Sequence, residues 1–240
     1  MFDFFKEIFD GFVFNFIEGD RWKLLLDGLW VTLEITGLSA LLGIPIGFLV
    51  GLVRAIEERD SGKRKHSFPV KCLFKALDIY VTVIRGTPVM VQLLIINFVV
   101  FVGFDFKMLA AVIAFGLNSG AYTSEIFRSG ILSVDFGQTE AGRSLGLTSA
   151  QTLWKIVMPQ AIKNALPALG NELITLLKET SIVGYIALID LTKSYSIIQS
   201  RTFSAFWPLI AIAFIYLVLV VGMSKLLNIF ERRLRKSDKR

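Results

Sequence analysis

The chain has 240 residues, of which 54% are hydrophobic and 21 are Phe, and its mean hydropathy is +0.62. This composition excludes a soluble domain of this length and indicates an integral membrane protein. The formal net charge is +6, but the basic residues lie beside apolar segments and so do not indicate a nucleic-acid partner. Cys72 and His66, each the sole residue of its type, offer no metal-ligand spacing, and the chain contains no phosphate-binding loop motif. We therefore expect no metal and no nucleotide on this chain.

Residues 1–23 are the first predicted element. Phenylalanines recur there at helical spacing among acidic side chains, at Phe2, Phe5, Phe9, Phe12 and Phe16. This pattern predicts an amphipathic helix that lies in the membrane interface. A signal peptide would have a basic start and an uninterrupted apolar run, so we expect this segment to be retained.

Five apolar segments follow and predict an all-α membrane domain over residues 24–231. A run of 19 uncharged residues, as in 35–53, measures about 28 Å at ~1.5 Å per residue, close to the thickness of the hydrocarbon core. The fourth segment is less regular, because it contains Pro167, Gly170 and charged side chains. The five predicted transmembrane helices are residues 35–53, 86–104, 108–124, 164–189 and 202–224, and a basic tail follows at 232–240.

Lys and Arg residues choose between the two orientations of five spans. The linker 54–71, the tail and the region around residues 128–163 together hold sixteen of them, against six on the opposite side. Because basic residues concentrate in the cytoplasm, the N-terminus is predicted outside, and the linker, the C-terminus and residues 138–160 inside.

Residues 138–160 interrupt the apolar pattern with two short predicted helices. Good helix formers run up to Leu145, and Gly146 suits the left-handed residue that closes a helix. Thr148 and Gln151 have the spacing of a capping box, and Pro159 ends the second helix or begins the next. Two short helices joined at a glycine form a compact protrusion that could dock into a groove of another protein. An ordinary solvated hairpin between two spans has the same local pattern.

Polar side chains share one face in each of two predicted spans. Asn118, Tyr122 and Glu125 are offset by four and seven positions in the third, and Glu172, Thr175 and Glu179 recur on one face of the fourth. A carboxylate at membrane depth is costly and should face water, a partner or a ligand. We expect these six residues to line a substrate pathway. A polar stripe between packed helices, or an ion pair with Lys178, is the alternative.

Three motifs resemble a known family. The sequence EAGRSLGLTSAQTLWKIVMP at 140–159 resembles the "EAA" loop with which permease subunits of bacterial ABC importers meet their ATPase. Arg-Gly-Thr-Pro at 85–88 with Gln92, and the patterns around 121–128 and 169–181, resemble motifs of polar amino acid permeases. A snorkelling arginine beside a proline-bent helix would account for much of the Arg-Gly-Thr-Pro motif. The resemblance assigns ATPase coupling to Glu140, Ala141, Gly142, Gly146, Leu147, Ile156 and Pro159, and a motif of the second span to Arg85, Gly86, Thr87, Pro88 and Gln92.

The resemblance implies the type I ABC importer permease fold with a cytoplasmic coupling-helix loop. Its partners would be cytoplasmic ATPase subunits that bind ATP and Mg, a second permease subunit that is a copy or a paralogue, and an extracytoplasmic binding protein. The substrate would be a polar amino acid carried across the bacterial inner membrane, and this chain would catalyse no covalent step. Gly142 stands where the family has its second alanine, which predicts a first short helix weakened by about 1 kcal/mol.

Two other functions are compatible with parts of the sequence. A membrane scaffold or sensor would use the loop only to bind a partner, and the absence of substrate flux would identify it. An intramembrane hydrolase would need a Ser/His/Asp set or paired metal ligands, and the sequence has neither at useful spacing.

Overall fold

The computed structural model describes residues 2–60 and 67–237, and every regular element in those ranges is a helix, as the all-α prediction requires. Residues 61–66 of the predicted linker, which include His66, and residues 238–240 of the predicted tail lie outside the described part. The elements are α1 (Phe2–Phe12), η1 (Val13–Ile17), η2 (Glu18–Asp20), α2 (Trp22–Asp60), α3 (Phe68–Gly86), α4 (Val89–Ile95), η3 (Ile96–Val100), α5 (Lys107–Leu132), α6 (Phe136–Ser144), α7 (Ser149–Thr152), η4 (Leu153–Val157), α8 (Met158–Glu179), η5 (Thr180–Ile186), α9 (Leu191–Thr202) and α10 (Phe206–Ser237).

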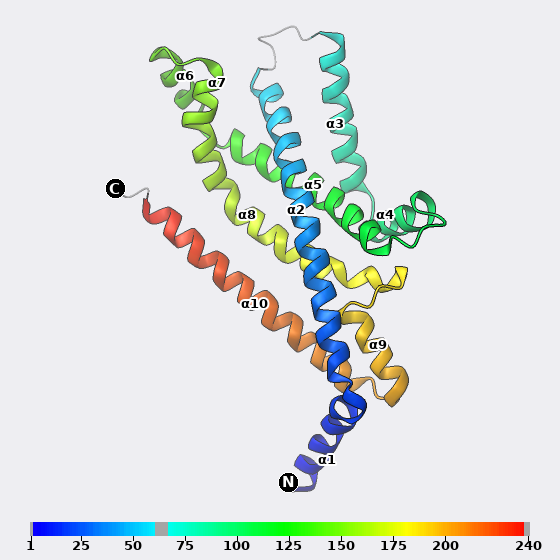
Figure 1. The fold of residues 1–240 in the computed structure, drawn as a ribbon. Coiled ribbons are helices and arrows are strands. Elements are labelled where there is room, and N and C mark those ends of the chain that lie inside the picture. Colours follow the sequence, from blue (N-terminus) through cyan, green and yellow to red (C-terminus); the bar gives the residue numbers. More distant parts are fainter. Residues whose placement is uncertain (1, 61–66, 238–240) are drawn as a thin grey trace.

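The 39-residue helix α2 runs along the molecule (Figure 1). Its N-terminal end lies with α1 and α9, and its C-terminal end lies at the same end of the molecule as α6 and α7. At ~1.5 Å per residue α2 is about 58 Å long, so the predicted span 35–53 is only its central part. The two ends of α2 therefore lie on opposite sides of any bilayer that it crosses.

The predicted second span, residues 86–104, is wrong in its bounds. Gly86 ends α3, and α4 with η3 leaves at an angle of 107° to it. The 7 and 5 residues of α4 and η3 measure about 18 Å together, which is too short to cross a hydrocarbon core of about 30 Å. Helix α3, which precedes the predicted span, forms the longer arm of this bent pair.

Other boundaries also differ from the prediction. The N-terminal segment consists of α1, η1 and η2; η1 ends at the extended residue Glu18, and positive φ angles at Gly19 and Asp20 separate the segment from α2. Phe16 is buried rather than turned toward lipid. The fifth helix begins at Phe206, because Phe203 adopts a left-handed conformation that ends α9. The fourth begins at Met158 and gives way to the 3-10 helix η5 at Thr180.

Helices α2 and α5 pack through facing small residues. Gly43, Gly47 and Gly51 in α2 lie against a small-residue face of α5. A Cβ at Gly43 would lie 2.8 Å from the carbonyl oxygen of Gly116, and a Cβ at Gly47 would overlap the Thr123 hydroxyl. Since lipid is as apolar as a side chain, close van der Waals contact rather than the hydrophobic effect holds such helices together.

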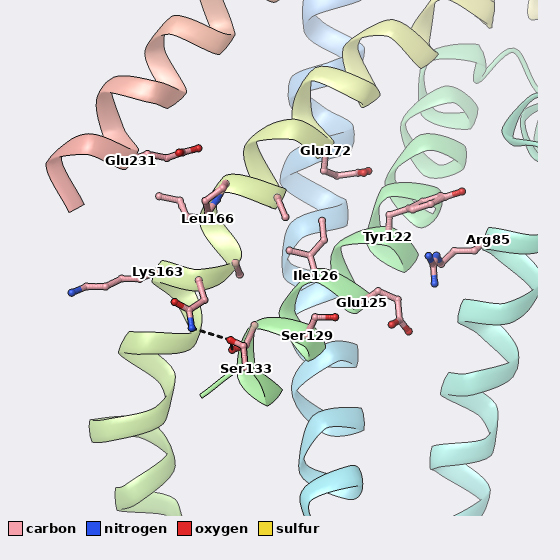
Figure 2. A pocket seen from close by; sticks show the side chains of 15 residues that line it. Arg85, Tyr122, Glu125, Ile126, Ser129, Ser133, Lys163, Leu166, Glu172 and Glu231 are labelled. Carbon is pink, nitrogen blue, oxygen red and sulfur yellow. Dashed lines mark hydrogen bonds between the residues drawn. The ribbon is translucent and has the colours of Figure 1, made fainter. Parts of the chain in front are cut away.

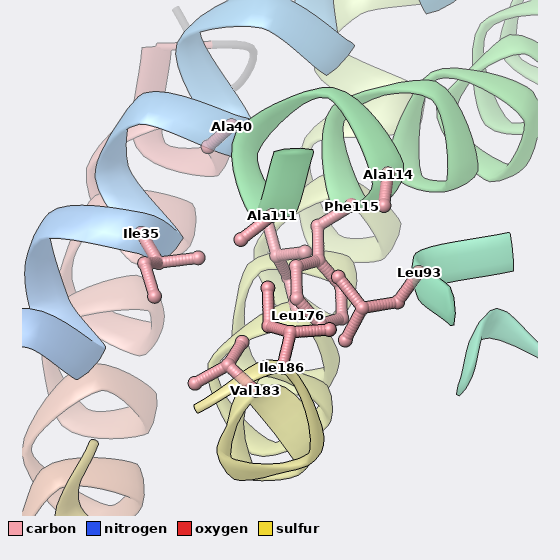
Figure 3. Close-up of a cluster of buried hydrophobic side chains, with 9 residues drawn as sticks. All are labelled: Ile35, Ala40, Leu93, Ala111, Ala114, Phe115, Leu176, Val183 and Ile186. Carbon is pink, nitrogen blue, oxygen red and sulfur yellow. The ribbon is translucent and has the colours of Figure 1, made fainter. Parts of the chain in front are cut away.

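An apolar core joins α2, α4, α5, α8 and η5 around the fully buried Phe115 (Figure 3). A second cluster lies where α2, α5, η4 and α8 meet near α6 and α7, and it includes Ala55, Ile131 and Val157. The first core fixes the helices that carry the polar side chains, and the second fixes the base of the loop 138–160.

Candidate functional site

The Arg-Gly-Thr-Pro motif forms the break between α3 and α4. Thr87 has extended φ/ψ angles of −123° and 146°, and Pro88 precedes the first residue of α4. A residue before proline is driven out of the helical region by contact with the proline ring, so the helix ends there. The break leaves backbone carbonyls at the end of α3 without helical partners.

Gln92 satisfies one carbonyl of α3, that of Ile84, and the carbonyl of Thr87 in the break. Its Nε2 atom, which is buried, donates toward the carbonyl oxygens of Ile84 at 2.8 Å and Thr87 at 3.1 Å and toward the Thr87 hydroxyl at 2.8 Å. Asn118 Nδ2 in α5 donates to Gln92 Oε1 at 3.1 Å. Asn118 is only 2% exposed, so the structure places this predicted pathway residue in the packing between α4 and α5.

A groove of about 760 Å³ lies between α5 and α8 and is bordered by α3 and α10 (Figure 2). Three of the six predicted pathway residues line it, namely Tyr122, Glu125 and Glu172, and so does Arg85 of the break. Thr175 and Glu179 do not line this groove. The remaining lining residues are Ile126, Ser129, Gly130, Ser133, Lys163, Asn164, Ala165, Leu166, Pro167, Ala168 and Glu231.

Arg85 and Glu172 bring opposite charges to this groove. The Arg85 guanidinium lies over the Tyr122 ring, 5.1 Å from its centroid, where the ring face attracts a cation. Glu172 takes part in none of the ion pairs found among residues 2–60 and 67–237. A zwitterionic ligand could therefore meet a cation and a carboxylate in one groove.

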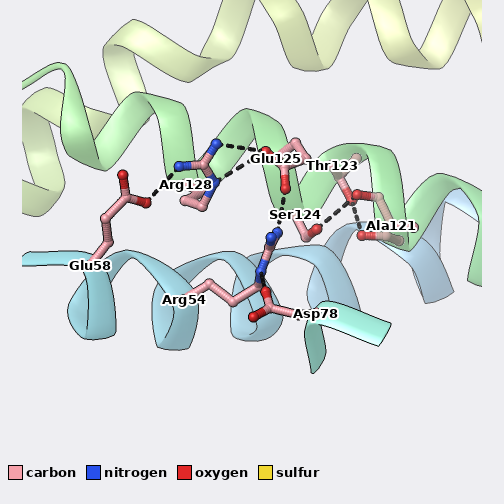
Figure 4. A network of polar contacts seen from close by, with 9 residues as sticks. Arg54, Glu58, Asp78, Ala121, Thr123, Ser124, Glu125 and Arg128 are labelled. Atoms are coloured by element: carbon pink, nitrogen blue, oxygen red, sulfur yellow. Dashed lines mark hydrogen bonds and ion pairs between the residues drawn. The ribbon is translucent and has the colours of Figure 1, made fainter. Parts of the chain in front are cut away.

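Glu125 is held by two arginines. It pairs with Arg54 of α2 and, at 2.8 Å, with Arg128 one turn along α5 (Figure 4). Arg54 also pairs with Asp78 of α3 at 2.7 Å, and Arg128 with Glu58 of α2 at 2.7 Å. This network links α2, α3 and α5. From the sequence, Arg54 was expected to act in topology alone, and nothing in local spacing relates it to Glu125, which is 71 positions away.

The loop 138–160 contains the two predicted short helices. Helix α6 begins two residues earlier than expected because Asp135 caps it, accepting a hydrogen bond from Gly137 N. It ends at Ser144, and the left-handed Gly146, where φ is +83°, follows its C-cap Leu145. Leu147 N donates to Gly142 O at 3.1 Å, and Gly146 N donates to Arg143 O at 3.0 Å. These two bonds define a Schellman motif.

The second half of the loop confirms the predicted capping box. Gln151 N donates to the Thr148 hydroxyl at 3.2 Å, and Thr148 N donates to Gln151 Oε1 at 2.8 Å. Helix α7 passes through the π-helical turn η4 directly into α8, with Pro159 in its first turn. Because proline lacks an N–H group, this early position is one that a helix tolerates.

Gly142 has a packing role that the sequence did not suggest. A Cβ there would lie 2.8 Å from both Ile156 Cδ1 and Thr152 Cγ2, on the helix that faces α6. Glycine at this position therefore permits the two short helices to touch, whereas the expected weakening of α6 stays a prediction. At the tip Leu145 is 82% exposed, and Trp154 beyond it is 52% exposed.

Among the described residues no group of three or more His, Cys, Asp or Glu side chains is placed to hold a metal ion. The missed features are the glycine stripe 43–47–51, the network around Glu125 and the hydrogen bonds of Arg59 to Ile131 O, Val134 O and the Thr139 hydroxyl. The stripe alone had a sequence signal, since small residues four apart are typical of close helix contacts.

The chain resembles known transport proteins over most of its length. Residues 43–236 match the family "Binding-protein-dependent transport system inner membrane component". The putative glutamine transport system permease protein GlnP of Rickettsia bellii is 36% identical over 88% of this chain and 92% of its own length. The L-cystine permease TcyB and the arginine permease ArtQ of Bacillus subtilis are 36% and 37% identical, over 92% and 89% of this chain and 90% and 94% of their own lengths.

Solved structures agree on the fold. One described as an amino acid ABC transporter with histidines is 43% identical and superposes with a TM-score of 0.77, covering 88% of this chain and 94% of its own. The methionine ABC transporter MetNI in an inward-facing conformation reaches a TM-score of 0.74 at 22% identity, over 90% of this chain and 98% of its own, and supports the fold alone. By its sequence and its fold, the chain belongs to the family of inner membrane components of binding-protein-dependent transport systems.

Proposed function

We propose that this chain is the permease subunit of an ABC importer for a polar amino acid in the bacterial inner membrane. Family membership and relatives named for glutamine, cystine and arginine transport support this function. A second permease subunit, which is a copy or a paralogue, would complete the pathway, and an extracytoplasmic binding protein would deliver the amino acid. Cytoplasmic ATPase subunits would bind ATP and Mg.

The proposed topology has five crossings, made by α2, by α3 with α4, and by α5, α8 and α10. The N-terminus lies outside and the C-terminus in the cytoplasm. Residues 1–23 form the interfacial segment, 24–231 the permease domain and 232–240 the tail. The sixteen-to-six distribution of basic residues supports this orientation. In Figure 1 the N-terminus lies at the end opposite α6 and α7, as the same orientation requires.

The loop 138–160 is the proposed coupling surface for the ATPase. The single observation that carries this proposal is its form, in which two capped helices packed at Gly142 present the tip at Leu145 and Gly146. Apart from its two neighbours in the chain, no described residue has an atom within 4 Å of a Cβ built on Gly146. A partner surface can therefore approach this backbone closely. Glu140, Ala141, Leu147, Ile156 and Pro159 complete the proposed surface.

The groove between α5 and α8 is the proposed part of the substrate pathway. Arg85 would attract the carboxylate of an amino acid and Glu172 its ammonium group. Tyr122 would position Arg85, because its ring face contacts the Arg85 guanidinium and its side chain lines the same groove. Glu125 lines the groove too, but its two arginines give it a structural role that a substrate would have to disrupt.

Transport by a purified complex tests this function. The chain would be reconstituted in liposomes with its ATPase and its binding protein, and uptake and ATP hydrolysis would be measured for each amino acid. The proposal requires ATP-dependent uptake of at least one polar amino acid. ATPase association without any flux would support the scaffold or sensor instead.

A further inference from the structure

Arg59, next to the last residue of α2, connects this helix to the corner between α5 and α6. Its Nη2 atom donates to the carbonyl oxygens of Ile131 at 2.5 Å and Val134 at 2.8 Å, and its Nη1 atom donates to the Thr139 hydroxyl at 3.2 Å. The two carbonyls belong to the end of α5 and the turn after it, and Thr139 lies in α6. One guanidinium therefore touches three consecutive parts of the chain.

The C-terminal end of α5 can stabilise the Arg59 cation without a carboxylate partner. The last carbonyls of a helix carry the negative end of its dipole, and Ile131 O, which also accepts from Ser133 N and Val134 N, is one of them. The ion pairs of the described residues do not include Arg59. Its hydrogen bonds go instead to backbone and hydroxyl oxygens, and the planar guanidinium can reach several of these at once.

The two ends of the coupling loop are attached to the membrane helices in different ways. On one side α7, η4 and α8 follow each other without a break, so a displacement of the loop is passed to α8 by the helix itself. On the other side α5 and α6 are separated by the turn at residues 133–135. Arg59 bridges that turn, and the packing of α2 on α5 through Gly43, Gly47 and Gly51 makes α2 a rigid support.

We infer that Arg59 is a positioning residue for coupling, which makes the α5–α6 corner move as one unit with α2. With this corner fixed, movement of the loop by the ATPase displaces α5 together with α8, the two helices that border the groove. Without it the turn would bend and only α8 would follow. This inference rests on the proposed function, because it gives the loop an ATPase to respond to.

Amide hydrogen exchange in the purified permease tests the corner without the ATPase. Arg59→Gln removes the charge and the bridge, and exchange of the amides at 133–139 should become about tenfold faster or more, since bonds from a charged donor are among the stronger ones. Arg59→Lys should restore part of the protection, because an ammonium can still donate to the two carbonyls. Thr139→Val should cause a smaller increase, and Lys71→Gln, at an exposed site on α3, should cause none.

Transport in the complete complex tests the coupling role. Arg59→Gln should bind the ATPase as wild type does, because the tip at Gly146 is intact, yet move fewer amino acid molecules per ATP hydrolysed. For Arg59→Lys, the number of amino acid molecules moved per ATP should lie between those of wild type and Arg59→Gln. Unchanged exchange, or faster exchange with an unchanged transport-to-ATP ratio, would overturn the inference. A wild-type complex that moves no amino acid would refute the proposed function and the coupling role with it, whereas the exchange result would still report on the corner.

Discussion

Asn118 in α5 donates its side-chain amide to Gln92 in α4, and Gln92 in turn donates to the end of α3. Three helices are thus joined by two buried amides at the place where the backbone turns by 107°. Backbone groups freed at a break inside a membrane protein must find partners within the protein. Gln92 supplies them, and the Arg-Gly-Thr-Pro motif is in part a solution to this backbone problem.

Gln92→Leu should destabilise the permease by removing the partner of the Asn118 amide and of the carbonyl oxygens of Ile84 and Thr87. Each buried polar group left unpaired costs about 1 to 3 kcal/mol. Thermal unfolding of the purified permease in detergent should therefore shift to lower temperature. Gln160→Leu is the matched control, because its hydrogen bond to Ile156 O is exposed. Equal unfolding temperatures for the two variants would show that Gln92 does not hold the break.

Gly47→Ala should be destabilising, whereas Gly222→Ala should not. A Cβ at position 47 would overlap the Thr123 hydroxyl and lie 2.9 Å from the carbonyl oxygen of Gly120, but one at position 222 meets nothing within 4 Å. Overpacking typically costs about 1 to 3 kcal/mol, while alanine on an open helix face gains about 0.5 to 1 kcal/mol over glycine. The measurement is unfolding of both variants in the same detergent. Unfolding of Gly47→Ala at the wild-type temperature would contradict the assigned contact.

How much the sequence could reveal depended on whether a feature is local. The capping box at Thr148 and the left-handed Gly146 were predictable, because their partners lie within a few residues. The break at Thr87 also had a local signal in the following proline, but the uniform hydropathy of residues 86–104 concealed it. A hydropathy pattern measures apolarity and not direction.

The candidate site was predictable only in part. Helical spacing grouped Tyr122 with Glu125 on one helix face and singled out Glu172 on another, and these three side chains line one groove, although Thr175 and Glu179 do not. Spacing could not show that Asn118 is buried against α4 while Tyr122 on the same face lines the groove, because the partner of Asn118 is Gln92 in another helix. Nor could it assign Arg54 to Glu125, because that pair exists only when α2 packs on α5 through the glycine stripe.

Cysteine labelling tests the proposed topology. In a background with the exposed Cys72 replaced by serine, Ser67→Cys should react only with reagents added from the cytoplasm, and Ser196→Cys only from outside. Both serines are exposed, unlike Ser194, which is fully buried against α2. The assay uses a membrane-impermeant maleimide on intact cells and on inverted vesicles. Labelling of the two positions from the same side, or in the reverse order, would contradict the five-span arrangement.

Gly146→Asp and Gly146→Asn should both lose ATPase association while inserting normally. Asparagine tolerates a left-handed backbone, so its effect would come from the added side chain and not from strain at φ +83°. Aspartate adds a charge, which at a buried contact costs several kcal/mol. The measurement is co-purification of the ATPase. Gly103→Asp is the control, because Gly103 has φ +82° and open space around it but lies before α5 and away from the loop. Normal association of both Gly146 variants would exclude this residue from the docking surface.

Glu172→Gln should raise the substrate concentration needed for half-maximal transport, or change which amino acids are accepted, and leave assembly intact. The carboxylate is costly at membrane depth, by about 2.5 to 3.5 kcal/mol on insertion scales, and none of the ion pairs of the described residues offsets it. A substrate ammonium group would provide the missing partner for the Glu172 carboxylate.

Glu125→Gln is the informative comparison, because removing that charge leaves Arg54 and Arg128 beside a neutral amide and should instead weaken the packing of α2 on α5. Uptake measured against amino acid concentration, together with gel filtration of each complex, separates the two effects. If Glu172→Gln dissociates the complex while its substrate dependence is unchanged, Glu172 is structural and the substrate must be bound by another face.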